Sequence, residues 1–162
     1  MDENPRAEPG AERLYRHAQA GKTILLVDDD LISLVRLKMI LERRGYRVIA
    51  EPEARLALAL IQNRMQEIDL VITDYRMPDM DGLEFSLALK HASPGTPLIL
   101  ITAHSDIESY LKAISIGVLE YINKPVIANE LLRIVNAVLD RNKDGDILRI
   151  LTDSRTEPRT EE

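Results

Sequence analysis

The sequence repeats one pattern five times between residues 22 and 142: a short apolar run, then a segment with helical, amphipathic periodicity. The apolar runs contain few polar residues, which is typical of strands that are buried on both faces. Such strands occur in parallel sheets, because the helices that connect parallel strands cover both faces of the sheet. The alternation therefore predicts an α/β fold with a doubly wound, five-stranded parallel sheet.

The limits of the expected elements follow from the pattern and from residues that typically begin or end helices. Pro52 is typical of a helix start, whereas Gly45 and Gly117 are typical of helix ends. We expect strands at 24–27, 46–50, 70–74, 98–101 and 118–122, and helices at 31–44, 52–65, 83–91, 106–116 and 126–141.

Two of the expected helices have clear apolar faces, which should contact the sheet. In the last helix this face consists of Leu131, Ile134, Val135 and Val138. In the first helix the residues that repeat near the helical period are Leu31, Leu34, Val35, Met39, Ile40 and Leu41.

The chain of 162 residues is expected to contain one domain, at residues 21–142. Residues 1–20 have few apolar side chains, so we expect an N-terminal extension that is disordered or forms a short helix. Residues 143–162 leave the alternating pattern and are rich in charge, so we expect a C-terminal tail that is mostly disordered.

The composition argues against several kinds of partner and location. A net charge of −6 disfavours nucleic acid as a partner of this chain. The apolar runs are too short to cross a membrane, and no signal-like segment opens the sequence. The chain has no cysteine, which disfavours a disulfide scaffold and favours the cytoplasm as its location.

Chemically active side chains follow four of the five predicted strands. Asp28 and Asp29 follow the first strand, Asp74 ends the third, Thr102 follows the fourth and Lys124 follows the fifth. Because ligands of open α/β sheets bind beyond the carboxyl ends of the strands, we expect these five side chains to share one cleft.

The chemistry of that cleft can be inferred from the types of side chain. Three carboxylates in close contact repel one another, so they imply a bound cation. Oxygen ligands without histidine or cysteine favour Mg²⁺, with Mn²⁺ as a further possibility. A lysine and a threonine beside the metal suit a phosphoryl group, which offers several acceptor oxygens.

The segment after Asp74 has residues that are typical of turns and helix starts. Pro78 fixes φ and Gly82 permits a positive φ, so both suit a loop. Asp79 and Asp81 are more easily explained as turn and capping residues than as metal ligands. Asp30 should likewise cap the helix that follows it.

These residues, in this order, resemble a known family. The pair Asp28-Asp29, Asp74 with Met77-Pro78-Asp79-Met80-Asp81-Gly82, Thr102-Ala103, and Tyr121 three residues before Lys124-Pro125 are similar to the CheY-like receiver domain of two-component response regulators. The resemblance covers about residues 22–142. It implies a flavodoxin-like (βα)5 fold with strand order 2-1-3-4-5.

The resemblance also implies a role for each residue of the charged cluster. Asp74 matches the phospho-acceptor. Asp29 would bind Mg²⁺ directly and Asp28 mainly through water, while Asp74 and the backbone carbonyl of Arg76 would complete the protein ligands. Lys124 would pair with the phosphoryl oxygens.

Thr102 and Tyr121 match the switch residues of the family: Thr102 would shift toward the phosphoryl group, and Tyr121 would rotate inward behind it. Lys124-Pro125 matches a site of a cis peptide bond, which costs little only before proline. Val118 stands where the family usually has alanine, and its bulk would narrow the space for the switch. His104 would either tune dephosphorylation or be an ordinary solvated residue.

The implied function is that of a phosphorylation-dependent signalling switch rather than an enzyme, although it would assist its own Mg²⁺-dependent phosphorylation and dephosphorylation. A sensor histidine kinase or a phosphotransfer protein would supply the phosphoryl group. The switch would change the face made by the helix at 106–116, the strand at 118–122 and the helix at 126–141. An unidentified protein, or a second copy in a homodimer, would bind this face.

We expect a stand-alone receiver, because no output domain can fold from the twenty or so residues after Arg141. Two alternatives stay open at this point: the receiver part of a longer DNA-binding transcription regulator, and an adaptor that works without phosphorylation. A P-loop enzyme is disfavoured, because the sequence has no G-x-x-x-x-G-K-[ST] motif. A haloacid-dehalogenase-type phosphatase needs a second aspartate where Arg76 stands.

Overall fold

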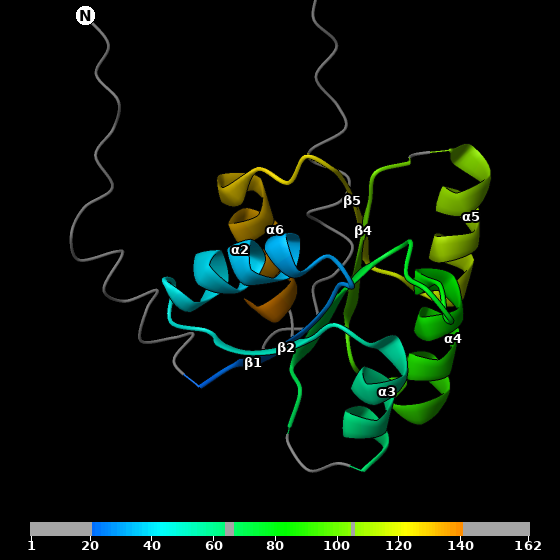
Figure 1. The fold of residues 1–162 in the computed structure, drawn as a ribbon, viewed down its shortest axis with the longest axis horizontal. Helices are drawn as coiled ribbons and strands as arrows, with labels where there is room; N and C mark the ends of the chain where they lie inside the picture. Colours follow the sequence, from blue (N-terminus) through cyan, green and yellow to red (C-terminus); the bar gives the residue numbers. More distant parts are fainter. Residues whose placement is uncertain (1–20, 64–66, 105, 141–162) are drawn as a thin grey trace, which may run out of the picture.

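The computed structural model describes residues 21–63, 67–104 and 106–140. These residues form a five-stranded parallel sheet in the order β2-β1-β3-β4-β5, with five helices between and after the strands. Figure 1 shows the helices on both sides of the sheet. The predicted doubly wound α/β fold and the strand order 2-1-3-4-5 are therefore confirmed.

Within the described residues, strands and helices alternate. The strands are β1 (Thr23–Val27), β2 (Arg47–Glu51), β3 (Leu70–Asp74), β4 (Leu98–Thr102) and β5 (Glu120–Asn123). The helices are α2 (Leu31–Glu42), α3 (Ala54–Gln62), α4 (Gly82–Ala92), α5 (Ile107–Ile116) and α6 (Ala128–Asp140). Every predicted element is present, and its ends differ from those predicted by at most three residues.

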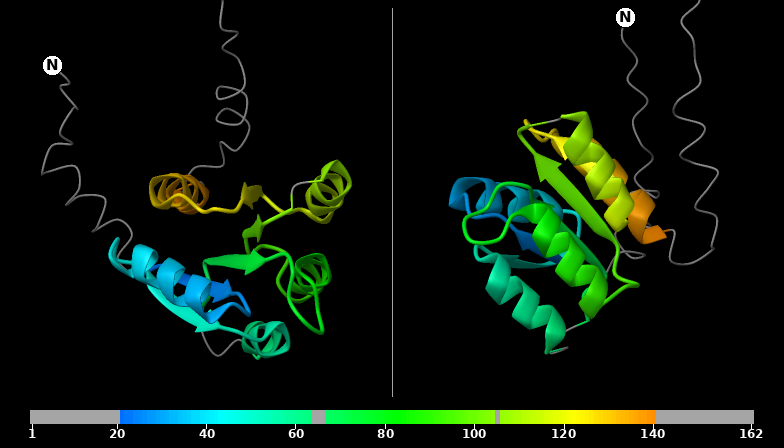
Figure 2. Two further views of the ribbon diagram at one scale, coloured as in Figure 1. Left: turned by 45° about the horizontal axis from the view of Figure 1, so that its top comes forward. Right: turned by 90° about the vertical axis from the view of Figure 1, so that its right-hand side faces the viewer.

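The sheet separates two apolar cores. Helices α2 and α6 cover one face, and α3, α4 and α5 cover the other (Figure 2). Alternate side chains of one strand enter different cores: Ile24 and Leu26 of β1 lie in the first, Leu25 and Val27 in the second. This explains why the strands are continuous apolar runs, because each side chain is buried whichever face it points to.

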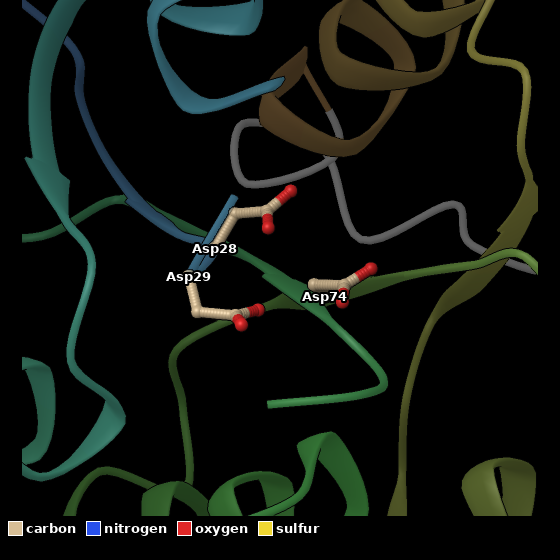
Figure 3. Close-up of side chains that lie close together, drawn as sticks. All are labelled: Asp28, Asp29 and Asp74. Atoms are coloured by element: carbon tan, nitrogen blue, oxygen red, sulfur yellow. The ribbon is translucent and has the colours of Figure 1, made fainter. Parts of the chain in front are cut away.

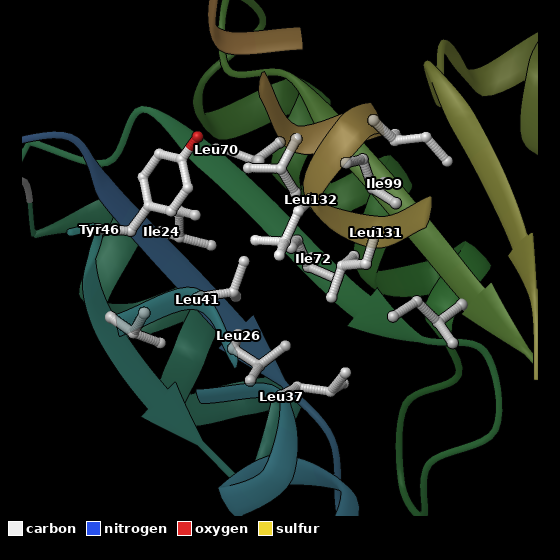
Figure 4. Close-up of a cluster of buried hydrophobic side chains, with 14 of the residues drawn as sticks. Ile24, Leu26, Leu37, Leu41, Tyr46, Leu70, Ile72, Ile99, Leu131 and Leu132 are labelled. Atoms are coloured by element: carbon white, nitrogen blue, oxygen red, sulfur yellow. The ribbon is translucent and has the colours of Figure 1, made fainter. Parts of the chain in front are cut away.

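The first core contains side chains of α2 and α6 packed on the central strands (Figure 4). All four predicted apolar residues of α6 are buried there: Leu131, Ile134, Val135 and Val138. Tyr46, which precedes β2, lies in the same core, and its hydroxyl donates a hydrogen bond to Asn136 on α6.

The predicted apolar face of α2 was only partly right. The residues that α2 buries are Leu34, Leu37 and Leu41, whereas the side chains of Leu31, Val35 and Met39 are 61%, 56% and 48% exposed. Both sets lie at helical spacing, so periodicity alone could not decide which stripe contacts the sheet. The position of the helix over β1 and β2 decides it.

Gly45 and Gly117 lie after helices α2 and α5. Their φ values are 94° and 100°, in the left-handed region expected for residues at helix ends. The predictions for 1–20 and 143–162 lie outside the described residues. Among the helices that the structure describes, none is both long and apolar enough to cross a membrane.

Candidate functional site

Asp28, Asp29 and Asp74 gather at the carboxyl edge of the sheet, as Figure 3 shows. The pairing of β1 with β3 brings them together, because Val27 lies opposite Thr73 and the next residues are Asp28 and Asp74. One carboxylate oxygen from each of the three residues lies within 4.8 Å of the other two. Asp28 and Asp74 are buried, and Asp29 is exposed.

Lys124 provides the positive charge of this cluster. Its Nζ lies 2.8 Å from Oδ1 of Asp74 and 3.6 Å from Oδ2 of Asp28. Burial by itself would lower the pKa of Lys124, but the hydrogen bond to Asp74 and the two carboxylates raise it, so this lysine is charged at neutral pH. The peptide bond between Lys124 and Pro125 is cis, as the resemblance implied.

Asp28 is the most buried carboxylate of the cluster, with only 2% of its surface exposed. Loss of hydration on burial raises its pKa, and the charges of Asp74 and Asp29 add to this. The backbone N–H of Asp30, 2.9 Å from Oδ1 of Asp28, and the charge of Lys124 offset part of the effect. The site therefore disfavours the charged form of Asp28 until more positive charge arrives.

The donor set fits a divalent cation. Three carboxylates and one ammonium, when all are ionised, carry an excess of two negative charges. The available ligand atoms are oxygens from two neighbouring strands, and their separation suits a hard ion such as Mg²⁺. Asp28, Asp29 and Asp74 are thus the residues that could hold the predicted metal. Arg76 lies exposed in the loop after β3, and the role of its carbonyl stays a prediction.

Thr102 and Tyr121 meet at the backbone of one loop residue. The Thr102 side chain is fully buried; its hydroxyl donates to the carbonyl oxygen of His104 at 2.9 Å and accepts from the His104 N–H at 3.0 Å. The Tyr121 hydroxyl donates to the same carbonyl at 3.0 Å. The ring of Tyr121 packs edge-on against Tyr110 of α5, with centroids 5.6 Å apart. The two predicted switch residues are thus joined through the loop that leads into α5.

The loop between Asp74 and α4 folds back onto the acceptor strand. A Cβ atom on Gly82 would lie only 2.5 Å from the backbone oxygen of Asp74, so only glycine fits there. Gly82 is not among the residues with positive φ, and the conformational reason given from the sequence was wrong. Asp79, at φ 66°, makes the turn, and Asp81 caps α4 in a reciprocal capping box with Glu84.

Sequence reasoning missed two parts of this region. One is the His104 carbonyl, because a backbone acceptor leaves no signal in the sequence. The other is Tyr75, whose hydroxyl lies 3.1 Å from Oγ of Ser109 in the first turn of α5. The only signal for Tyr75 was its place directly after Asp74, a polar aromatic residue at the end of a buried strand.

The sequence and the structure were compared with those of known proteins. Residues 24–136 match the family model of the response regulator receiver domain. The two-component response regulator ARR10 of Arabidopsis thaliana is 37% identical over 123 residues, which are 76% of this chain but 22% of that protein. The uncharacterized transcriptional regulatory protein YbdJ of Bacillus subtilis is 36% identical over 122 residues, which are 75% of this chain and 52% of that protein.

Solved structures give the same result for the fold. A CheY-like response regulator receiver domain protein from Methanospirillum hungatei JF-1 superimposes with a TM-score of 0.73 at 34% identity, over 76% of this chain and 98% of that one. A response regulator receiver domain protein from Clostridium thermocellum gives a TM-score of 0.71 at 31% identity, over 75% of this chain and 97% of that one.

Proposed function

The chain belongs to the response regulator receiver domain family, and we propose that it is a phosphorylation-dependent signalling switch with Asp74 as the phospho-acceptor. Receiver domains are signalling proteins that interact with histidine kinases or phosphotransfer proteins. We propose such a protein as the phosphoryl donor of this chain. The observation that carries the proposal is the contact of Asp74 with Lys124 beside the acidic pair.

The proposed chemistry is a phosphoryl transfer to a carboxylate. An Oδ atom of Asp74 attacks the phosphorus of a phosphohistidine, a P–O bond forms, the P–N bond breaks, and the imidazole keeps the electron pair and takes up a proton. Lys124, which already contacts Asp74, neutralises charge on the transferred oxygens. Mg²⁺ held by Asp28, Asp29 and Asp74, with the proposed Arg76 carbonyl, would supply further neutralisation. Hydrolysis of the mixed anhydride would reset the switch.

The proposed response begins at Thr102 and ends on the surface of α5. A phosphoryl group on Asp74 offers new acceptors at the edge of the sheet where Thr102 ends β4. A hydroxyl that turns toward it must leave the His104 carbonyl, which frees the loop and Tyr121 to rearrange. The loop leads into α5, so the face formed by α5, β5 and α6 would change.

That face offers an apolar surface to a partner. Ile107, Leu111 and Ile114, hereafter the α5 stripe, lie on one side of the helix and are 77%, 59% and 44% exposed. Exposed apolar residues at this spacing fit a protein partner or a second copy of the chain better than water. We propose that an unidentified protein, or a second copy in a homodimer, binds this surface.

The test of the acceptor is direct. Purified protein is incubated with Mg²⁺ and acetyl phosphate. We expect a single phosphoryl adduct, which adds about 80 Da to the mass of the protein and is stable in acid and labile to hydroxylamine. Asp74→Asn should abolish it, whereas Asp69→Asn, a change at an aspartate paired with Lys22 at the start of the same strand, should not. An adduct that persists in Asp74→Asn would refute the proposal.

The receiver could stand alone or be the receiver part of a longer transcription regulator. The chain spans 22% of the response regulator ARR10 and 52% of the transcriptional regulatory protein YbdJ, which supports the longer protein as a second candidate. Reading the gene beyond the codon for Glu162 separates them.

The adaptor alternative predicts equal partner affinity for the wild type and Asp74→Asn. The cytoplasmic location inferred from the cysteine-free sequence is likewise a prediction.

A further inference from the structure

Tyr75, the residue directly after the proposed acceptor Asp74, is joined by a hydrogen bond to helix α5. Its backbone is fixed on both sides: its N–H donates to the carbonyl of Ile101 at 2.8 Å, and its own carbonyl accepts from the N–H of Gly82 at 2.7 Å. Ile101 directly precedes Thr102, and Gly82 begins α4. The Tyr75 backbone is thus attached to the acceptor strand, to the end of β4 and to the start of α4.

The side chain of Tyr75 reaches the first turn of α5. Its hydroxyl lies 3.1 Å from Oγ of Ser109. Ser109 is buried, and its hydroxyl donates to Oδ2 of Asp106 at 2.8 Å. Because that bond uses the only proton on the Ser109 hydroxyl, Tyr75 is the donor to Ser109. A directed chain of hydrogen bonds therefore runs from Tyr75 through Ser109 to Asp106.

Asp106 is the N-cap residue of α5, directly before Ile107. Its Oδ1 accepts from the backbone N–H of Ser109 at 2.8 Å, which caps the helix. The hydrogen bonds from Ser109 lower the pKa of Asp106, so the cap is charged at neutral pH. The chain that begins at Tyr75 thus ends on the group that fixes the beginning of the helix.

This link reaches α5 through hydrogen bonds that differ from those already described. Thr102 and Tyr121 act on the loop before α5 through the His104 carbonyl, and Tyr121 also touches Tyr110. Tyr75, which directly follows β3, contacts the first turn of α5 through Ser109. Neither Thr102 nor Tyr121 takes part in the hydrogen bonds between Tyr75, Ser109 and Asp106.

We propose that Tyr75 is a positioning residue for the response, which holds the first turn of α5 to the acceptor strand so that a change at Asp74 moves the α5 stripe. This rests on the proposed function, since it needs Asp74 to be the acceptor. Tyr75 would act on the response only and leave the transfer of the phosphoryl group unaffected, because its hydroxyl points to Ser109 instead of the carboxylate cluster.

The test compares Tyr75→Phe with the wild type by NMR, using the amide signals of Ile107, Leu111 and Ile114 with and without Mg²⁺ and beryllofluoride. We expect the equilibrium between the positions that α5 takes without and with beryllofluoride to change about fivefold, the size expected for one hydrogen bond. Ser109→Ala should have at least this effect, because it also removes the bond to Asp106. The double variant should behave like Ser109→Ala alone, because the bond that Tyr75→Phe removes is already lost there.

The matched control is Tyr46→Phe. It also removes a tyrosine hydroxyl that makes a hydrogen bond in the interior, but to Asn136 on α6. We expect it to keep the α5 response of the wild type even where it lowers stability. An unchanged response in Tyr75→Phe and Ser109→Ala, or an equal change in Tyr46→Phe, would overturn the inference.

The acceptor reaction separates failure of this inference from failure of the proposed function. Tyr75→Phe should form the acetyl phosphate adduct at the wild-type rate. Loss of the adduct in Tyr75→Phe alone would show that Tyr75 serves the chemistry and not the response, which contradicts the inference. Absence of the adduct in the wild type would refute the proposed function, and the inference would fall with it.

Discussion

Two parts of the site lie side by side at the edge of the sheet but are held by different forces. The charged part consists of Asp28, Asp29, Asp74 and Lys124. It has more acidic than basic groups, and the pKa of Asp28, its most buried member, is raised. In the hydroxyl part, Thr102 and Tyr121 make neutral hydrogen bonds to the backbone of His104.

The difference indicates a division of labour. A cluster with excess negative charge gains much from binding a cation, and the cation together with Lys124 can then stabilise an anionic phosphoryl group, so the cluster suits the chemistry. A neutral hydrogen bond contributes only about 1 kcal/mol, so a hydroxyl can exchange one acceptor for another at small cost. That property suits a switch, whose two states must differ little in free energy. Changes in the charged part should therefore affect rates strongly, and changes in the hydroxyl part should affect populations mildly.

The largest effect is expected for Lys124→Met. Removal of the positive charge that contacts Asp74 should slow phosphorylation by acetyl phosphate about a hundredfold or more, the usual cost of losing one group that stabilises developing charge. The initial rate of adduct formation at saturating Mg²⁺ measures it. Lys112→Met, which removes an exposed lysine paired with Glu108 on α5, is the control and should leave the rate unchanged.

Thr102→Ala should come next, and it should act on a different quantity. The variant removes a fully buried hydroxyl that makes two hydrogen bonds with His104, so we expect a loss of about 1–3 kcal/mol in the free energy of unfolding. Urea unfolding measures it. Adduct formation should slow far less than in Lys124→Met, while the α5 signals stop responding. Thr102→Ser keeps the hydroxyl and should restore the response; if it does not, the hydroxyl is not the switching group.

A smaller effect is expected for Tyr121→Phe. The variant keeps the edge-on contact with Tyr110 and loses only the bond to the His104 carbonyl. We expect a loss of about 0.5–1.5 kcal/mol in the free energy of unfolding, again by urea unfolding. A cost as large as that of Thr102→Ala would mean that the two hydroxyls are not the unequal partners that their burial indicates.

The smallest effects concern two aspartates whose pKa values are shifted in opposite directions. The pKa of Asp28 is raised in the folded protein, so its contribution to stability falls as the pH rises from the ordinary aspartate value through the folded pKa. The pKa of Asp106 is lowered, so its contribution is present above the ordinary value and is lost as the pH falls through the folded pKa.

We therefore expect Asp28→Asn to raise the urea midpoint at pH 7 in the absence of Mg²⁺, and Asp106→Ala to lower it. Both differences should shrink below pH 4, roughly the ordinary range of the carboxyl group. Mg²⁺ should stabilise the wild type more than Asp28→Asn. A lowered midpoint for Asp28→Asn at pH 7 would show that its bonds to Asp30 and Lys124 outweigh its loss of hydration.

Much of the site could be predicted because parallel topology does the assembly. Once Asp28, Asp74, Thr102 and Lys124 are placed at the ends of four of the five parallel strands, the sheet brings them to one edge whatever the details of packing. The capping roles of Asp30 and Asp81 could also be predicted, because a cap depends only on a few neighbouring residues.

What the sequence could not give are contacts that depend on where a whole helix lies. Tyr75 and Ser109 are 34 positions apart, and neither carries a charge or belongs to a motif. The choice between the two apolar stripes of α2 was open for the same reason, since both have the helical period. Gly82 was predicted to lie in a loop but begins α4, and the close approach of the Asp74 carbonyl could not be seen before the chain was folded.

The sequence by itself therefore determined the alternation of strands and helices, the strand ends and the residues gathered there, because hydrophobic periodicity is local and parallel strands end at one edge. The strand order was implied by the resemblance to receiver domains. The tertiary structure alone decided that burial raises the pKa of Asp28, which backbone carbonyl Thr102 and Tyr121 share, and how Tyr75 reaches α5. These depend on burial and on distances of a few ångströms between separate elements, which only the packing of helices on the sheet sets.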